Sequence, residues 1–478
     1  MKLHLSLASL AVLALLLSAR STVTAPDTAS PRPAASPADT PPLGTGEAVA
    51  AVQESPEEGQ CLTCHKEKSP GLYKQWLESK HALHQVTCLD CHKAAPGDPD
   101  AFLHEGTVIA TLVTPKDCGV CHEEEAEQVQ ASYHATAGEI LESADAYLAH
   151  AAGGEPAAIT GCENCHGTTV RIDRGSPNRL AAESWPNTGI GRINPDGSKG
   201  ACNACHTRHS FSVKQARQPE ACGKCHLGPD HPQKEIYEES KHGNAYFTNM
   251  AEMNLAAERW VLGLDYFVAP TCATCHMSAT QRQPLNHDVG RRISWTLRPA
   301  VSVMKSGWQQ KRANMKDVCT NCHGAAWVNG HYYQFDGLVQ LYNTKFAVPA
   351  GEVMGLIRSK GLLENPAEFS NEIEWIYWEL WHHEGRRARH GASMMGPDYT
   401  WWHGIYEVAH HFYMGFVPAA REYGDPDVNA ALDRILADPV HAWMQRPTAD
   451  IKADIRSGKL KELFQDLYRP GRTQAGGH

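Results

Sequence analysis

The chain has 478 residues, a formal net charge of -10 at pH 7 and sixteen cysteines. This length exceeds that of one ordinary domain, so more than one structural part is expected. The acidic balance argues against nucleic acid as a partner. It favours a basic protein partner, which an acidic surface attracts over long range.

The N-terminus has the pattern of an export signal. Lys2 precedes the apolar run LSLASLAVLALLLSA, which has the length of a secretory signal and is short for a membrane span. We predict a signal peptide over residues 1–25 and a flexible Pro/Ala-rich linker over residues 26–58. Since no later stretch is apolar enough to cross a bilayer, we expect a soluble, periplasmic protein.

Every cysteine belongs to a C-x-x-C pair that a histidine follows directly. This is the attachment signature of c-type haem, in which two thiols bond the porphyrin and the adjacent imidazole binds the iron. Structural zinc would need pairs coupled in twos and gives no reason for the histidines, and disulfides would not repeat one spacing. The pairs are Cys61/Cys64, Cys88/Cys91, Cys118/Cys121, Cys162/Cys165, Cys202/Cys205, Cys222/Cys225, Cys272/Cys275 and Cys319/Cys322. The histidines are His65, His92, His122, His166, His206, His226, His276 and His323. We therefore expect eight covalently bound haem c groups.

Histidines outside the motifs are candidates for the sixth iron ligand, which in an electron-transfer haem is usually His. The segments ESKHALH (78–84) and ESKHG (239–243) repeat Ser-Lys-His, as a repeated ligand-bearing helix would. The candidates are His81, His84, His104, His134, His150, His209, His242 and His287, with His231 as a further one. The spacing alone does not pair individual ligands with individual irons.

The regions between the motifs are rich in Gly, Pro, Asn and Asp, and strand patterns are nearly absent. After His323 the composition changes. Ile373, Ile376, Tyr377 and Leu380 recur at the spacing of an amphipathic helix. We predict a mainly α multihaem cytochrome c fold with few strands. A haem-binding domain is expected over residues 59–325, and a helical C-terminal domain over residues 326–478.

The motifs leave two classes of function open. One is an electron conduit in which every iron has six ligands, and the other is an enzyme in which one iron keeps a position for substrate. Two further segments narrow the choice, namely CHLGPDHPQKEIYEESKHG (225–243) and RHGASMMGPDYTWWHGIYE (389–407). With the eight motifs, they resemble the hydroxylamine oxidoreductase family, which includes hydrazine dehydrogenases and nitrite-reducing relatives. The resemblance covers about residues 59–420.

The resemblance implies which haem is catalytic and how it is modified. In the family it is the fourth haem, here that of Cys162 and Cys165 with His166. A tyrosine that matches Tyr399 bonds covalently to this porphyrin from a neighbouring subunit, so the resemblance implies a homotrimer whose subunits are cross-linked. Without the resemblance, Tyr399 would be a residue packed at a turn.

The resemblance also implies a distal group. Asp230 and His231 match a pair that collects protons from the substrate, although the residues alone fit a turn with a haem ligand. A distal tyrosine of the family matches Tyr332 or Tyr333, and a packing role is an equal alternative for either.

The implied activity is oxidation of hydroxylamine to nitric oxide or nitrite, with a cytochrome c as electron acceptor. Alternatives are a hydrazine dehydrogenase, a nitrite or hydroxylamine reductase, or a non-catalytic electron conduit. Every motif ends in His, so the lysine-ligated catalytic haem of related nitrite reductases is missing, and Tyr399 favours the oxidising branch. Some relatives end in an apolar anchor, whereas this chain ends in RTQAGGH.

Overall fold

The structure, a computed structural model, describes residues 56–142 and 147–468. The predicted signal peptide (1–25) and nearly all of the predicted linker (26–58) lie outside these residues. Contacts group residues 53–478 into one compact unit. The first helix begins at Pro56, so the last residues of the predicted linker are helical.

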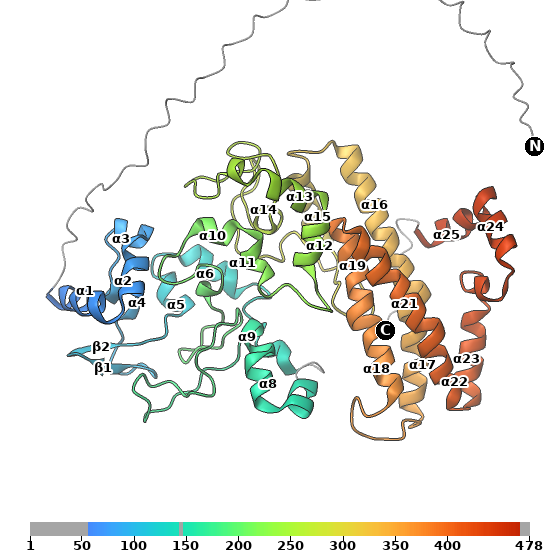
Figure 1. Ribbon diagram of the computed structural model, residues 1–478, viewed down its shortest axis with the longest axis horizontal. Helices are drawn as coiled ribbons and strands as arrows, with labels where there is room; N and C mark the ends of the chain where they lie inside the picture. Colours follow the sequence, from blue (N-terminus) through green and yellow to red (C-terminus); the bar gives the residue numbers. More distant parts are fainter. Residues whose placement is uncertain (1–55, 143–146, 469–478) are drawn as a thin grey trace, which may run out of the picture. The chain divides into compact units, whose positions relative to one another are not determined.

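The part of the chain that carries the haem motifs consists of short helices joined by loops (Figure 1). Its first elements are α1 (Pro56–Lys68), α2 (Pro70–Leu77), α3 (Lys80–Leu83), α4 (Cys88–His92), β1 (Phe102–His104), β2 (Thr107–Ile109), α5 (Pro115–Gly119), α6 (Glu123–Gln130), η1 (Glu139–Glu142), η2 (Ala149–Gly153), α8 (Gly154–Thr160) and α9 (Cys162–His166). They are followed by η3 (Cys202–Ala204), α10 (Val213–Arg217), α11 (Pro219–Gly223), α12 (Gln233–Glu239), α13 (Lys241–Thr248), η4 (Met250–Met253), α14 (Cys272–His276) and α15 (Trp308–Cys319).

Several motifs form a helical turn of their own. The helices α4, α9 and α14 each begin at the first cysteine of a motif and end at its histidine. Thr87 and Thr271 are the N-caps of α4 and α14, and each belongs to a capping box. Residues three apart lie on the same face of a helix, so the turn brings both cysteines of a motif to one side.

The only β-sheet of the described residues is a hairpin that presents a histidine. Strand β1 pairs antiparallel with β2, with His104 opposite Thr107. Glu105 and Gly106 form the two-residue turn, and both have positive φ, as a turn that matches the strand twist requires. The hairpin therefore holds His104 at the end of a short, fixed strand.

From α16 onwards the helices are longer and pack on one another (Figure 1). The elements are α16 (Ala325–Tyr342), η5 (Asn343–Ala347), α17 (Val348–Ser359), α18 (Glu372–Trp378), η6 (Glu379–Glu384), α19 (Gly385–Met394), α20 (Pro397–Thr400), η7 (Trp401–Tyr406), α21 (Glu407–His410), η8 (His411–Phe416), α22 (Val417–Glu422), α23 (Pro426–Leu436), η9 (Ala442–Gln445), α24 (Thr448–Ser457) and α25 (Lys459–Tyr468).

The predicted apolar stripe lies on α18 and η6. Ile373 and Leu380 are buried in the largest apolar core of these helices, and Ile376 and Tyr377 pack against it half-buried. The amphipathic helix is therefore confirmed. Helices dominate the described residues, and the mainly α fold class is confirmed as well. Within the same residues, no helix has the length and apolar character that a membrane span requires.

Candidate haem sites and candidate active site

All sixteen cysteines lie within the described residues, and none forms a disulfide. Within residues 56–142 and 147–468, no three His, Cys, Asp or Glu side chains gather as the ligands of a single metal ion. The metal-binding side chains instead meet in twos. This arrangement differs from a structural zinc site, because such a site needs four ligands.

Three motif cysteines do not lie in the enclosed positions that we expect of haem-binding thiols. Cys64, Cys121 and Cys322, the second cysteines of the first, third and eighth motifs, are exposed, whereas the other motif cysteines are partly buried. The reason is the position of their elements. Cys64 lies on α1, which packs mainly on α2 and α4, and Cys121 follows α5, which packs mainly on α6. Few neighbours are therefore present to cover the thiols of Cys64 and Cys121, and haem attachment at each of the eight motifs stays a prediction.

Four motif histidines face a second imidazole at nearly the same distance. Metal–nitrogen bonds of about 2 Å place two imidazole centres about 6 Å apart across one iron. The measured ring-centre separations are 6.3 Å for His65 with His104, 6.3 Å for His92 with His209, 6.3 Å for His122 with His81, and 6.0 Å for His323 with His242. In each pair one partner is a motif histidine and the other is a candidate from the sequence. The residues therefore fit a haem iron between two imidazoles.

Two more candidates lie near motif histidines without forming such a clear pair. The ring centre of His134 is 6.2 Å from that of His226, and His134 also interacts electrostatically with His276. His287 interacts electrostatically with His206. His134 can thus serve the sixth or the seventh haem.

Two candidates do not meet a motif histidine in the described contacts. His84 is exposed at the end of α3, three residues from His81. His150 is exposed in η2 and interacts electrostatically with Glu163, which lies inside the fourth motif. Of the repeated Ser-Lys-His segments, the structure therefore brings the first histidine of each, His81 and His242, to a motif.

Burial keeps these imidazoles in the form that binds a metal. It lowers the pKa of His206, His209 and His226 to about 4 each, because the charged form is poorly solvated. The neutral imidazole is the ligand form of histidine. The folded chain therefore presents neutral nitrogen donors at neutral pH.

Cysteines of different motifs also meet, which shows which haem sites adjoin. Three pairs of thiols lie within hydrogen-bonding contact, namely Cys118 with Cys202, Cys165 with Cys225, and Cys222 with Cys272. They join the third site to the fifth, the fourth to the sixth, and the sixth to the seventh. The exposed Cys121 interacts electrostatically with Cys91, so the third site adjoins the second as well. Adjoining sites of this kind are suited to passing electrons from haem to haem.

The fourth motif differs from the others in its surroundings. Nδ1 of His166 lies 3.1 Å from the carbonyl oxygen of Ala137. Among the described residues no second imidazole ring faces His166. Gly167 has φ +84°, and a Cβ on Gly189 would overlap the backbone nitrogen of Gly167. Because only glycine fits at such a contact, the segment around Gly189 packs directly against the backbone that follows the motif.

Asp230 and His231 lie on the loop between α11 and α12, directly after the sixth motif. The loop is closed by a hydrogen bond from the amide of Lys234 to the carbonyl of His226, at 3.0 Å. The Nε2 atom of His231 is 3.6 Å from Oδ2 of Asp230, and the ring centre of His231 is 6.0 Å from that of His226. Since Cys225 touches Cys165, the sixth site, which this loop follows, adjoins the fourth.

Helix α19 and the turn before it reach this loop from the C-terminal part. Nη1 of Arg386 donates to the same Oδ2 of Asp230 at 3.0 Å, and the Arg386 side chain is almost fully buried. His383 also interacts with Asp230, and burial lowers the pKa of His383 to about 4. The pair predicted from the motif is thus part of a larger polar cluster.

His390 is a residue that sequence reasoning missed. It is partly buried on α19, its buried Nδ1 atom has no hydrogen-bond partner among the described residues, and it interacts electrostatically with His226 and His231. Burial lowers its pKa to about 3. His390 is therefore a further candidate ligand for the sixth haem. Nothing in the sequence marks His390 as a ligand, because it lies far beyond the last motif, although it is the second residue of the segment 389–407.

Tyr399 is half-buried on α20 and lies beside α12. Its backbone amide donates to Oε1 of Glu239 at 3.4 Å. Burial, followed by the nearby carboxylates Glu235 and Glu239, raises the pKa of the Tyr399 hydroxyl. The structure therefore places Tyr399 next to the helix that follows Asp230 and His231.

The two tyrosines of α16 lie elsewhere. Tyr332 is buried, with the guanidinium of Arg312 4.5 Å from its ring centre, and Cys319 of the eighth motif nearby. Tyr333 is 48% exposed. The described contacts bring neither side chain to Asp230 or His231.

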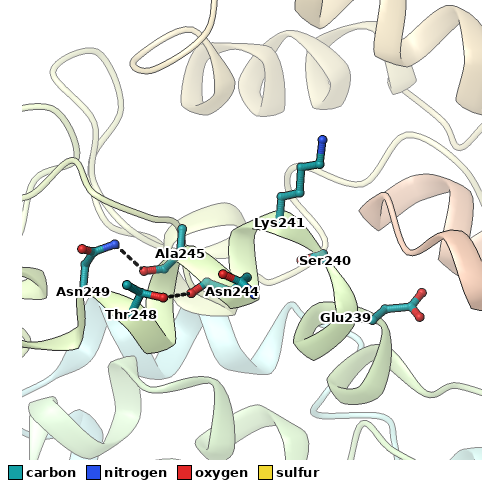
Figure 2. Close-up of a pocket in the computed structure, with 7 residues that line it drawn as sticks. All are labelled: Glu239, Ser240, Lys241, Asn244, Ala245, Thr248 and Asn249. Carbon is teal, nitrogen blue, oxygen red and sulfur yellow. Dashed lines mark hydrogen bonds between the residues drawn. The ribbon is translucent and has the colours of Figure 1, made fainter.

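A polar cavity of about 330 Å³ lies along α13 (Figure 2). In Figure 2 the side chains of Asn249 and Thr248 hydrogen-bond to the backbone of their own helix, at the carbonyls of Ala245 and Asn244. Of its lining residues, Glu239 contacts the segment of Tyr399. The cavity has none of the motif cysteines or candidate ligands in its lining, so we do not assign the active site to it.

Two protein families match parts of the chain. The family described as "Seven times multi-haem cytochrome CxxCH" matches residues 194–365. The family "Cytochrome c7 and related cytochrome c" matches residues 148–227. Both descriptions agree with covalently bound haem c.

Similar proteins point the same way. A probable nitrite reductase-hydroxylamine oxidoreductase fusion protein of Kuenenia stuttgartiensis is 29% identical over 250 residues, which cover 46% of this chain and 25% of the relative. The chain thus spans about a quarter of that relative's length.

Two solved structures resemble the fold. A hypothetical multiheme protein has a TM-score of 0.68 and 26% identity, covering 76% of this chain and 94% of its own. A reducing HAO-like protein complex of Kuenenia stuttgartiensis has a TM-score of 0.55 and 20% identity, covering 80% of this chain and 87% of that chain. This second likeness is one of fold only. With the paired motif histidines, these similarities support a multihaem c-type cytochrome that resembles, over 46% of its length, a probable nitrite reductase-hydroxylamine oxidoreductase fusion protein.

Proposed function

We propose that the chain is an exported octahaem oxidoreductase that oxidises hydroxylamine at the haem of the fourth motif and delivers the electrons to a cytochrome c. The observation that carries the proposal is the position of Asp230 and His231. They lie on the loop after the sixth motif, and Cys225 of that motif touches Cys165 of the fourth. A carboxylate and an imidazole thus lie at the site next to the fourth, the one haem site whose motif histidine meets no second imidazole among the described residues.

The residues of this loop are suited to collecting protons. Oxidation of hydroxylamine to nitric oxide releases three electrons and three protons, and oxidation to nitrite consumes one water molecule and releases four electrons and five protons. Haem at the fourth motif supplies the iron for this chemistry, and the other haems carry the electrons away. His231 accepts a proton at Nε2, and the carboxylate of Asp230, 3.6 Å away, stabilises the resulting positive charge.

We also propose that the protein is a homotrimer in which Tyr399 joins the fourth haem of a neighbouring subunit. The segment around Tyr399 supports this reading because it is unusually apolar for a surface. Trp401, Trp402 and Tyr406 are each about half exposed, at 49%, 56% and 50%, and their rings contact one another. A cluster of large exposed aromatic side chains is typical of a protein–protein interface.

The test is a steady-state assay of the purified holoprotein with hydroxylamine, with hydrazine, and with a cytochrome c as acceptor. We expect hydroxylamine oxidation in the wild type. Asp230→Asn and His231→Ala should lower turnover by about 10²–10⁴-fold while the haem content stays normal. The matched control is His84→Ala, which removes an exposed histidine at the end of α3.

Reduction of nitrite is the second candidate activity. It is favoured by the relative described as a probable nitrite reductase-hydroxylamine oxidoreductase fusion protein. An assay with nitrite and a reduced dye decides between the two directions. Reduction of nitrite without any oxidation of hydroxylamine would replace our proposal with this one. If the wild type catalyses neither reaction, the electron conduit is the better description.

A further inference from the structure

Two groups approach the carboxylate of Asp230. One is the imidazole of the adjacent His231, and the other is the guanidinium of Arg386, which lies far away in the sequence. Arg386 Nη1 and His231 Nε2 both approach the Oδ2 atom of Asp230, at 3.0 and 3.6 Å. The Asp230 side chain is 18% exposed and that of Arg386 8% exposed. At this depth the guanidinium is poorly solvated, and the carboxylate supplies the charge that balances it.

Arg386 is held in place by more than this ion pair. Its Nε atom donates to the carbonyl of Arg298 at 2.8 Å, and its guanidinium lies 5.2 Å from the ring centre of Trp381. On the next turn of α19, Arg389 donates to the carbonyl of Pro299 at 2.8 Å. These contacts therefore hold the guanidinium of Arg386 in place independently of Asp230, so it can orient the carboxylate.

We infer that Arg386 is a positioning residue that fixes Asp230 toward His231, and that Asp230 in turn cancels the charge of Arg386, so that the site accepts neutral nitrogen compounds and disfavours anions such as nitrite. The inference rests on the proposed function for the identity of the substrate. The charge balance itself rests only on the geometry. At pH 7 hydroxylamine is mostly neutral and hydrazine is mostly a cation, whereas nitrite is an anion.

The inference predicts opposite effects from the two ends of the ion pair. Asp230→Asn keeps the shape of the side chain and leaves the charge of Arg386 uncompensated, so the affinity for nitrite should rise about tenfold. Arg386→Gln leaves the carboxylate uncompensated, so the affinity for nitrite should fall below that of the wild type. The double variant should bind nitrite with an affinity close to that of the wild type, because both charges are gone.

The measurement is equilibrium titration of the oxidised holoprotein with nitrite, followed by its haem absorbance. Haem content and low-spin spectra are recorded for each variant. Arg387→Gln is the matched control, because Arg387 has a similar burial and pairs with Glu407 at 2.5 Å instead of with Asp230. We expect nitrite affinity in this control to remain at the wild-type value.

Two results would overturn the inference. One is an unchanged nitrite affinity in Asp230→Asn, and the other is a raised affinity that persists in the double variant, since it would then not come from Arg386. If Asp230→Asn loses haem, the nitrite affinity of Arg386→Gln decides the question, because the inference predicts weaker nitrite binding in that variant. Absence of hydroxylamine oxidation in the wild type would refute the proposed function and leave the titration result intact.

Discussion

At the scale of single residues, the fold tolerates a buried lysine in its helical part. Lys345 lies in η5 and is 9% exposed, with its Nζ atom 5.4 Å from the ring centre of Phe346 and 5.1 Å from that of Phe464. Burial lowers its pKa to about 8, although the carboxylate of Asp438 acts in the opposite direction. Burial of the charged ammonium group of Lys345 therefore destabilises the fold, and contacts with the surrounding aromatic rings offset this effect only in part.

The pH dependence of stability follows from this shift. Between pH 8 and the ordinary lysine pKa, the unfolded chain binds a proton that the folded chain does not, so stability rises with pH across this window. The gain amounts to about 3 kcal/mol at most. Lys345→Met should raise the thermal midpoint at pH 7 and flatten the rise between pH 8 and 10, both measured by circular dichroism. An unchanged pH profile in Lys345→Met would show that another group titrates there.

Tyr399 allows a second prediction at this scale. A tyrosine joined to the haem of another subunit makes the chains inseparable in denaturant, because the link is covalent. We expect the wild type to run near the mass of three chains on a denaturing gel and Tyr399→Phe to run as a single chain. Tyr333→Phe is the control, because Tyr333 is an exposed tyrosine on α16. A wild type that runs as one chain would make Tyr399 a packing residue.

At the scale of elements, short helices and one hairpin each deliver a single ligand. The hairpin holds His104, and α3 holds His81 in the middle of four residues. The N-cap of α3 is Ser79, whose side chain accepts from the amide of Ala82. The Ser-Lys-His repeat thus combines a cap and a ligand, and α13 has the same arrangement with Ser240 and His242.

Two histidines of one segment give a matched test of this arrangement. His81 faces His122 at 6.3 Å, whereas His84 is exposed three residues later. His81→Ala should remove one low-spin signal from the electron paramagnetic resonance spectrum, and His84→Ala should leave the spectrum unchanged. Loss of the signal in His84→Ala would mean that the loop after α3 rearranges when haem binds.

The same elements show which features can be predicted from the sequence. The motifs, the mainly α class and the apolar stripe of α18 are local patterns, and local patterns are visible in a sequence. The pairing of His92 with His209 is not, because it depends on how loops fold back over long separations. Arg386 was missed for the same reason, since nothing around it in the sequence points to a carboxylate on the loop after the sixth motif.

The exposure of a side chain is a second property that the motifs do not predict. The spacing of Cys64 and Cys121 is the same as that of every other motif cysteine, yet both are exposed because their helices have few packing neighbours. Tyr332 matches a distal tyrosine of the resembled family, and its buried contacts lie beside the eighth motif. In each case the surroundings depend on how whole elements pack on one another, which a local pattern does not specify.

At the scale of the whole molecule, several of the eight motifs form adjoining sites. We expect the mass of the mature protein to exceed that of its processed polypeptide by eight haems, as measured by intact-mass spectrometry. A serine variant of both cysteines in the first motif, Cys61 and Cys64, should reduce the excess to seven. An excess of fewer than eight haems in the wild type would show that at least one motif is not used, and the exposed Cys64, Cys121 and Cys322 make the first, third and eighth motifs the ones to examine.

The pairing of histidines also bears on how the protein matures. The chain emerges N-terminus first, so the third and eighth motifs find their partners, His81 and His242, already present when they appear. The first two motifs precede theirs, and His92 has no second ligand until residue 209 has been made. Haem attached at the second motif therefore passes through a long interval with an open iron position. Binding of the second ligand, His209, requires closure of a loop that contains the third, fourth and fifth motifs. A six-coordinate iron at the second motif would therefore show that this part of the chain has folded.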